Sequence, residues 1–325
     1  MSKISQKEIL KNMTRNELDS IRKRLNIKGV SKLSKDALVD KITSYLEENL
    51  EDILRTQVFG EDRVLIEAAL KSGGELNIED FLTEDKIVCP YALKSLLELG
   101  IFMEDRETGK CFISSDLMFK LNSFFKNKGN IAIVERRDEI LKVLKGLLFY
   151  YGLAEEDIIV KISRKYLPKN NSEEIIETIR DYVIGHKDII QKENIYMLET
   201  VDESLVEARK NMENVPFYRP KVDLVKDMAE KFAIEDTEFE RSMVDFMTSQ
   251  LHIEEAYAFR ALYELLLEMR NGYDPSQIFN KYVEALRVDN DNGHNFLENF
   301  KALYLNTRSW KLKGNTPKEL GFSIQ

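Results

Sequence analysis

Glycine and proline, the residues that most often end helices, are scarce in this chain, with 14 Gly and 6 Pro among 325 residues. From Val201 onward, apolar residues recur almost throughout at steps of three or four, the spacing of one helix face. Hydrophobic residues make up 43% of the chain and charged residues 32%, which is enough for a buried core and a solvated surface. These features predict a mainly α-helical protein, and at roughly 100–200 residues per domain its length predicts two or three domains.

The first residues, MSKISQKEILKN, lack the apolar stretch of a signal peptide, and no run of about 18 apolar residues would cross a bilayer. The two cysteines, Cys89 and Cys111, form neither a CxxC pair nor a spaced set with the three histidines. We expect both thiols to be buried in a reducing compartment, without a disulfide. The sequence therefore predicts a cytoplasmic protein that has no membrane partner.

Charge is unevenly distributed along the chain. Residues 1–46 hold 11 Lys and Arg against 5 acidic residues, a net charge of +6. The remainder carries 37 basic and 52 acidic residues, a net charge of −15. A reversal of sign between segments indicates that the front of the chain meets a polyanion and that the acidic body does not.

The basic front segment has the pattern of two helices joined by a short extended link. Thr14 with Glu17 has the spacing of a capping box, which predicts that a helix begins there. Segment 26–33 is expected to be the link, and Ser34 is positioned to cap the second helix. In both helices Leu, Ile and Val share one face, and we expect the basic residues to point largely toward solvent. The pattern predicts a helix–extension–helix module over residues 1–48.

The stretch NELDSIRKRLNIKGVSKLSKDALVDKI, residues 16–42, resembles the N-terminal helical module of Rho termination factor and the related SAP and LEM-type modules. Rho and SAP relatives are associated with RNA or DNA, so the resemblance implies nucleic-acid binding and use in transcription termination or regulation. LEM-type relatives bind protein, and a further alternative is that the lysines only solvate the helices. We expect backbone phosphates to be contacted, with little base discrimination, by Arg15, Arg22, Lys23, Arg24, Lys28, Lys32, Lys35 and Lys41.

The next segment alternates helical patterns with short extended ones. Within residues 61–114, an apolar helix ends at Gly73-Gly74, and a second begins at Pro90. Two short alternating runs then flank a turn at 105–109, which is the pattern of a β-hairpin. Helices followed by a hairpin are typical of a winged helix.

The same order recurs at 139–199, so we predict an internal repeat of two winged-helix-like units, 49–128 and 129–202. A winged helix that recognises DNA bases needs basic or amide side chains on its recognition helix. The candidate helices at 90–100 and 172–185 have few basic residues, and the second carries four acids. This favours protein contact or a scaffold role for both units.

Residues 203–325 are expected to form a C-terminal helical bundle. Its last part contains the only tryptophan, Trp310, beside Arg308; we expect it to anchor the tail to the core, the alternative being an anion-binding or stacking role. The wording NTR-x-W-x-L-x-G-x-T-P-x-E-L, together with YYGL at 150–153, resembles uncharacterised bacterial proteins with a Rho-like front module and a helical body. Some relatives end in a SEC-C zinc motif, whereas this chain has no cysteine after Cys111.

Motifs for catalysis and metal binding are missing from the sequence. It has no P-loop, no H-E-x-x-H pair, no G-x-S-x-G turn and no cysteine with a nearby histidine. We therefore predict no catalytic residue, cofactor or metal, although a site assembled from distant residues escapes motif analysis. The leading hypothesis is a non-enzymatic nucleic-acid-associated protein whose acidic body binds an unknown protein or a second copy. The alternative is a protein-interaction scaffold that does not bind nucleic acid.

Overall fold

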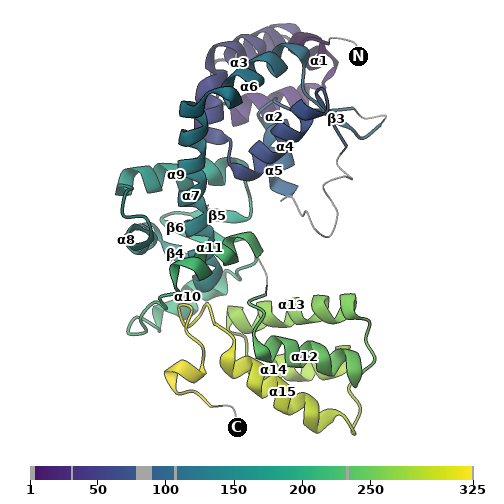
Figure 1. Cartoon of the computed structure of the whole chain (residues 1–325), viewed down its shortest axis with the longest axis vertical. Helices are drawn as coiled ribbons and strands as arrows, with labels where there is room; N and C mark the ends of the chain where they lie inside the picture. Colours follow the sequence, from purple (N-terminus) through teal and green to yellow (C-terminus); the bar gives the residue numbers. More distant parts are fainter. Residues whose placement is uncertain (1–3, 31, 78–89, 106–107, 232–233, 324–325) are drawn as a thin grey trace. The chain divides into compact units, whose positions relative to one another are not determined.

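The computed structural model describes residues 4–30, 32–77, 90–105, 108–231 and 234–323. The chain forms two compact units, each made of two segments (Figure 1). Unit 1 comprises Met1–Leu141 and Glu173–Asp188, and unit 2 comprises Lys142–Ser172 and Ile189–Gln325. Over the described ranges the chain is mainly helical, with two three-stranded antiparallel sheets, which confirms the predicted fold class.

The front of unit 1 consists of α1 (Gln6–Asn12), α2 (Arg15–Arg24) and α3 (Lys35–Gln57). Both predicted helix starts are confirmed: Thr14 and Glu17 form the capping box of α2, and the Ser34 hydroxyl accepts from the Ala37 amide at the start of α3. Apolar residues of all three helices join one core with the elements that follow. Residue 48, the predicted end of the front module, lies inside α3.

The first winged-helix-like unit follows directly. It contains α4 (Gly60–Lys71), β1 (Glu75–Leu76), α5 (Pro90–Glu98), β2 (Met103–Glu104), β3 (Cys111–Phe112) and α6 (Ser115–Lys126). β2 and β3 form the predicted antiparallel hairpin, and β3 lies between β1 and β2. Cys111 is buried as expected, whereas Cys89 lies outside the described residues.

The predicted second winged-helix-like unit, 129–202, also has a helix and a short strand ahead of a two-stranded hairpin, with two helices between that strand and the hairpin. Its residues 129–141 and 173–188 belong to unit 1, and the rest belong to unit 2. It contains α7 (Lys128–Tyr151), β4 (Leu153–Glu155), α8 (Glu156–Tyr166), α9 (Ser172–Gly185), β5 (Ile189–Lys192) and β6 (Ile195–Leu198). Its last strand, β6, lies between β4 and β5. Both sheets therefore place the last strand in the middle, and the internal repeat stays a prediction.

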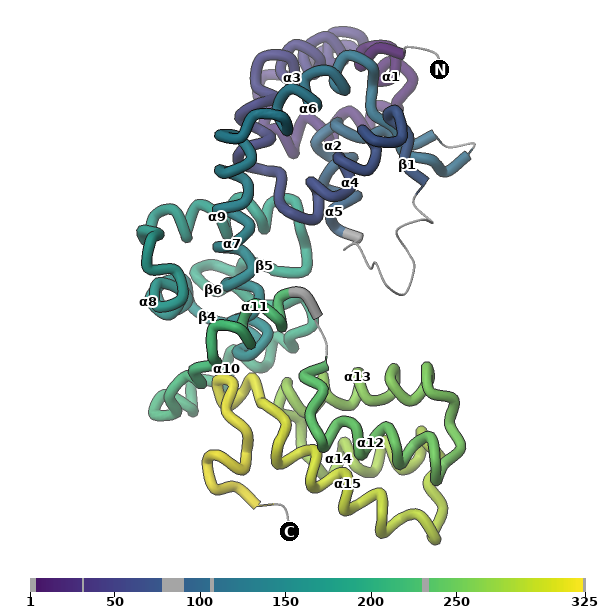
Figure 2. Tube along the Cα trace, viewed as in Figure 1, coloured from purple at the N-terminus to yellow at the C-terminus, as the bar shows by residue number. Residues whose placement is uncertain are grey.

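The remaining elements belong to unit 2. They are α10 (Ser204–Lys210), α11 (Val222–Lys231), α12 (Glu238–Ser249), α13 (Glu255–Asn271), α14 (Pro275–Ala285), α15 (Gly293–Asn306) and a 3-10 turn, η2 (Lys318–Leu320). Figure 2 shows α12 to α15 side by side, and their Leu, Met, Phe and Tyr residues form a common core. The predicted C-terminal helical bundle is therefore confirmed for these four helices.

Trp310 anchors the C-terminal tail, as the sequence predicts. Its side chain is 1% exposed, and its indole N–H donates to the carbonyl oxygen of Phe149 at 2.8 Å. A Cβ on Gly152 would lie 2.5 Å from the indole ring, and this residue has φ +68°, so only glycine fits there. Arg308 does not stack on Trp310; its guanidinium lies 3.4 Å from the ring centre of Tyr218.

None of the helices in the described ranges is both long enough and apolar enough to cross a membrane. Across the same ranges, no three His, Cys, Asp or Glu side chains gather in a way that would hold a metal ion.

Candidate functional site

The turn at the end of α2 is set by hydrogen bonds that close the helix. The amide of Asn26 donates to the carbonyl of Lys23 at 3.1 Å, and that of Ile27 donates to the carbonyl of Arg22 at 2.9 Å. This pair of bonds is a Schellman motif, which needs a left-handed residue just after the helix; Asn26 supplies it with φ +53°. Because Ile27 is buried, the chain folds back over the end of the helix.

This turn creates an open depression of about 320 Å³. The depression is lined by Arg22, Lys23, Asn26, Ile27, Lys28, Gly29 and Val30, so no acidic residue lines it. Lys23 and Lys28 are exposed and form no ion pair with a described residue, whereas Arg22 is held by Asp19, 2.7 Å from Nε to Oδ1. We call this surface the basic depression. It presents cationic N–H donors around a small space, which is the chemistry that suits a phosphate or another oxyanion.

The structure spreads the other predicted phosphate-contacting residues around the module. Arg15 donates to the carbonyl of Leu33 at 2.9 Å, and Lys35 donates to that of Lys11 at 2.6 Å. Lys32 and Lys41 are exposed. None of these four residues lines the basic depression, so the predicted set of phosphate-contacting residues is broader than the depression.

The prediction that Arg24 points toward solvent is wrong. Its residue exposure is 8%, and its Nη1 donates to Oε1 of Gln57 at 2.6 Å. Burial lowers the pKa of its guanidinium, an effect that the nearby carboxylate of Asp62 opposes. Arg24 lies three positions after the buried Ile21, on a side of α2 that packs against α5, and is therefore unavailable to a phosphate in solution.

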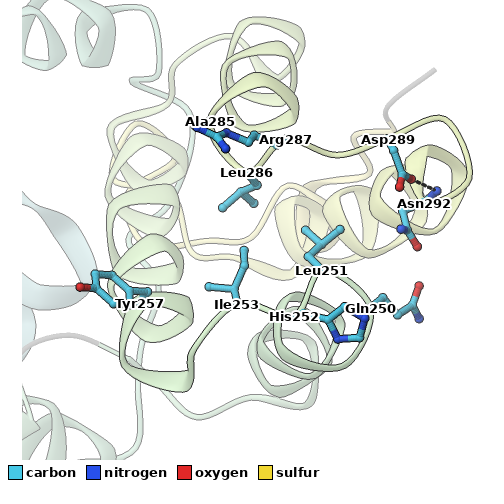
Figure 3. Close-up of a pocket in the computed structure, with 10 residues that line it drawn as sticks. All are labelled: Gln250, Leu251, His252, Ile253, Tyr257, Ala285, Leu286, Arg287, Asp289 and Asn292. Atoms are coloured by element: carbon cyan, nitrogen blue, oxygen red, sulfur yellow. Dashed lines mark hydrogen bonds between the residues drawn. The ribbon is translucent and has the colours of Figure 1, made fainter.

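A second pocket, of about 540 Å³, lies in unit 2 between the α12–α13 and α14–α15 loops. Figure 3 shows Leu251, Ile253 and Leu286 pointing toward one another in its middle, with polar residues around them. Arg287 brings positive charge, but Asp289 also lines the pocket and accepts from the Asn292 backbone amide at 2.9 Å. The lining thus mixes both signs of charge and does not favour an anion. No sequence motif predicted this pocket, because its residues come from two separate loops.

Among the described residues of unit 1, a buried Asp–His pair most resembles part of a catalytic site. Nε2 of His186 lies 3.0 Å from Oδ1 of Asp62, and the two side chains are 1% and 0% exposed. The ring of Tyr182 stacks on that of His186, with centres 4.2 Å apart. Asp62 also accepts from the amide of Phe59 at 2.9 Å. Since solvent does not reach either member of the pair, we assign it to packing between α4 and the end of α9.

Comparisons with protein-family models, with curated proteins and with solved structures find no match for this chain.

Proposed function

We propose that this protein is a non-enzymatic nucleic-acid-binding protein that holds the phosphate backbone at the basic depression. The observation that supports this most directly is that Arg22, Lys23 and Lys28 line one depression from which acidic residues are absent. The surrounding segment is also positively charged: residues 1–46 carry a net charge of +6, whereas the whole chain carries −9. A transcription-related role, in termination or regulation, is what the resemblance to the Rho module implies. The acidic body would bind a protein partner or a second copy.

The binding mechanism follows from charge and geometry. The Asp19 carboxylate holds Arg22 in place, while Lys23 and Lys28 are exposed and form no ion pair with a described residue. When three such cations meet phosphates they release condensed counterions from the nucleic acid. On duplex DNA the logarithm of the binding constant should then fall with the logarithm of salt concentration with a slope of about −2.7. Backbone contacts of this kind predict little discrimination between base sequences.

The pocket in unit 2 supports the alternative function, a protein-interaction scaffold. Its middle is apolar, and Tyr257 at its edge is 63% exposed. A pocket with an apolar middle and an exposed aromatic side chain at its edge is typical of surfaces that bind protein side chains. Binding through it should respond weakly to salt, which separates the two functions experimentally.

The test is fluorescence anisotropy of the full chain with labelled single-stranded RNA, single-stranded DNA and duplex DNA across a salt series. The informative variant is Lys23→Ala/Lys28→Ala, which leaves one of the three cations of the basic depression. On duplex DNA, the salt slope of this variant should become shallower, changing from about −2.7 to about −0.9. The control, Lys221→Ala/Lys318→Ala, removes equal charge from exposed positions in unit 2 and should keep the wild-type slope.

Two results would argue against the proposal. One is the absence of binding to all three polymers at low salt, which would leave the scaffold function as the better explanation. The other is an equal loss of affinity in both double variants, because that would mean that net charge, and not the basic depression, governs binding.

A further inference from the structure

Phe119 on α6 is the most exposed aromatic side chain among the large hydrophobic residues that the structure describes. It is 79% exposed, whereas Phe124 on the same helix is 3% exposed. Leaving a phenylalanine ring in water forgoes the favourable free energy of burying it. Nothing in the packing of α6 requires an aromatic residue at this position, because Leu117, Leu121 and Phe124 supply the buried face.

The residues that follow Phe119 on its face of α6 are polar or basic. Ser123 and Lys126, four and seven positions further along α6, share its face of the helix and are exposed. Lys128 follows at the start of α7 and is exposed as well. Phe119 and Lys126 are separated by about 10 Å along the helix axis, at a rise of about 1.5 Å per residue.

The Phe119 face of α6 also carries one acidic residue, three positions before the ring. Asp116 is the only acid between Ser115 and Lys126, and its two carboxylate oxygens accept from the backbone amide of Gln6 at 3.0 and 3.1 Å. In an acidic chain, a helix face with a bare aromatic ring and neighbouring lysines is complementary to a ligand that combines flat apolar surfaces with negative charge. Single-stranded nucleic acid has that combination, since its unpaired bases stack and its phosphates are anionic.

The helix α6 also belongs to the same compact unit as the basic depression. Besides the Asp116 contact with α1, the Lys120 ammonium donates to the carbonyl of Glu47 on α3 at 3.3 Å. Figure 1 shows α6 alongside α1 and α3. An aromatic side chain is missing from the lining of the basic depression, whereas α6 presents an exposed one.

We infer that Phe119 is a stacking platform for an unpaired base, with Lys126 and Lys128 contacting the adjacent phosphates. This inference rests on the proposed function and narrows it, because it makes single-stranded RNA or DNA the preferred ligand over a duplex, whose bases are already stacked. A protein or a second copy of this chain would use the same ring as an apolar contact. The test below distinguishes binding of a protein or a second copy from binding of single-stranded nucleic acid.

The test compares Phe119→Ala, Phe119→Leu and Phe119→Trp in the full chain, using a labelled 20-nucleotide oligo-U, oligo-dT and a duplex of equal length. Removing one base-stacking contact costs about 1–3 kcal/mol, so Phe119→Ala should weaken single-strand binding roughly 5- to 150-fold. The leucine variant should lose a similar factor, because it is apolar but has no ring, and the tryptophan variant should bind at least as tightly as the wild type. Duplex affinity and all salt slopes should stay unchanged, since no charge is removed.

The control is Val64→Ala, which truncates another exposed apolar side chain of unit 1, 51% exposed, and should alter no affinity. Single-strand affinity that is unchanged in Phe119→Ala would overturn the inference, and the proposed function would stand if Lys23→Ala/Lys28→Ala still lost binding. Absence of binding by the wild-type chain would overturn both. If sedimentation instead showed a wild-type dimer that Phe119→Ala dissociates, a second copy would be the occupant and the inference would be wrong.

Discussion

Replacing Gly146 by alanine tests how closely α7 packs against α11 in unit 2. A Cβ at Gly146 would lie 1.9 Å from the carbonyl oxygen of Val225 and 2.7 Å from its carbonyl carbon, distances at which something must shift. Alanine is favoured over glycine inside a helix by about 1 kcal/mol, which opposes the clash. Overpacking typically costs about 1–3 kcal/mol and occasionally more, and here the clashing atoms belong to the backbone and cannot rotate away. We expect a net loss of about 2 kcal/mol in the free energy of unfolding.

For a unit of this size, such a loss should lower the melting temperature by about 4–8 °C, which thermal unfolding followed by circular dichroism measures. The matched control is Gly293→Ala at the first position of α15, where an added Cβ would meet no heavy atom within 4 Å. This control should melt at the wild-type temperature or slightly above it. If Gly146→Ala also melted at or above the wild-type temperature, the close approach of α7 and α11 would be refuted.

Two further predictions concern buried ionisable groups. Burial raises the pKa of the Cys111 thiol to about 11, so in a Cys89→Ser background it should react slowly with a thiol reagent until denaturant is added; fast labelling of the native protein would contradict its burial. Burial also raises the pKa of Glu235 above its ordinary 4.5. The folded state then binds this proton more tightly than the unfolded state, so the contribution of Glu235 to stability should decline as pH rises above about 4.5. Glu235→Gln should flatten this part of the curve of melting temperature against pH, and an unchanged slope would count against the assignment.

Local signals predicted the helix starts of the front module but not all of its helices. Thr14 and Ser34 cap α2 and α3 as predicted. The short helix α1 was missed, although Ser5 and Glu8 form a capping box there. Seven residues are too few for a helix to be stable alone, and α1 depends on distant contacts: the Gln6 side chain donates to the carbonyl of Gly100 at 2.7 Å. Contacts of that kind have no signature in a short stretch of sequence.

Most of the candidate site could be predicted, because charge and helix periodicity are local properties. The depression itself could not be predicted, because it depends on a left-handed backbone conformation at Asn26. The burial of Arg24 depends on residues far along the chain. A Cβ on Gly185 would lie 2.3 Å from Nη2 of Arg24 and 2.7 Å from Oγ of Ser95, so the guanidinium occupies space left by a glycine 161 positions away.

The three consecutive basic residues at the end of α2 therefore have different roles. Successive side chains on a helix point about 100° apart, so three in a row cannot share one face. Arg22 and Lys23 line the basic depression, and Arg24 packs inside unit 1. Replacing all three together would weaken folding and binding at once and would not separate them. Arg24→Ala alone should lower the melting temperature and keep the wild-type salt slope, whereas Lys23→Ala/Lys28→Ala should lower the slope and keep the melting temperature. If Arg24→Ala reduced the salt slope as well, the buried guanidinium would have to reach phosphate, and the division of roles along α2 would be wrong.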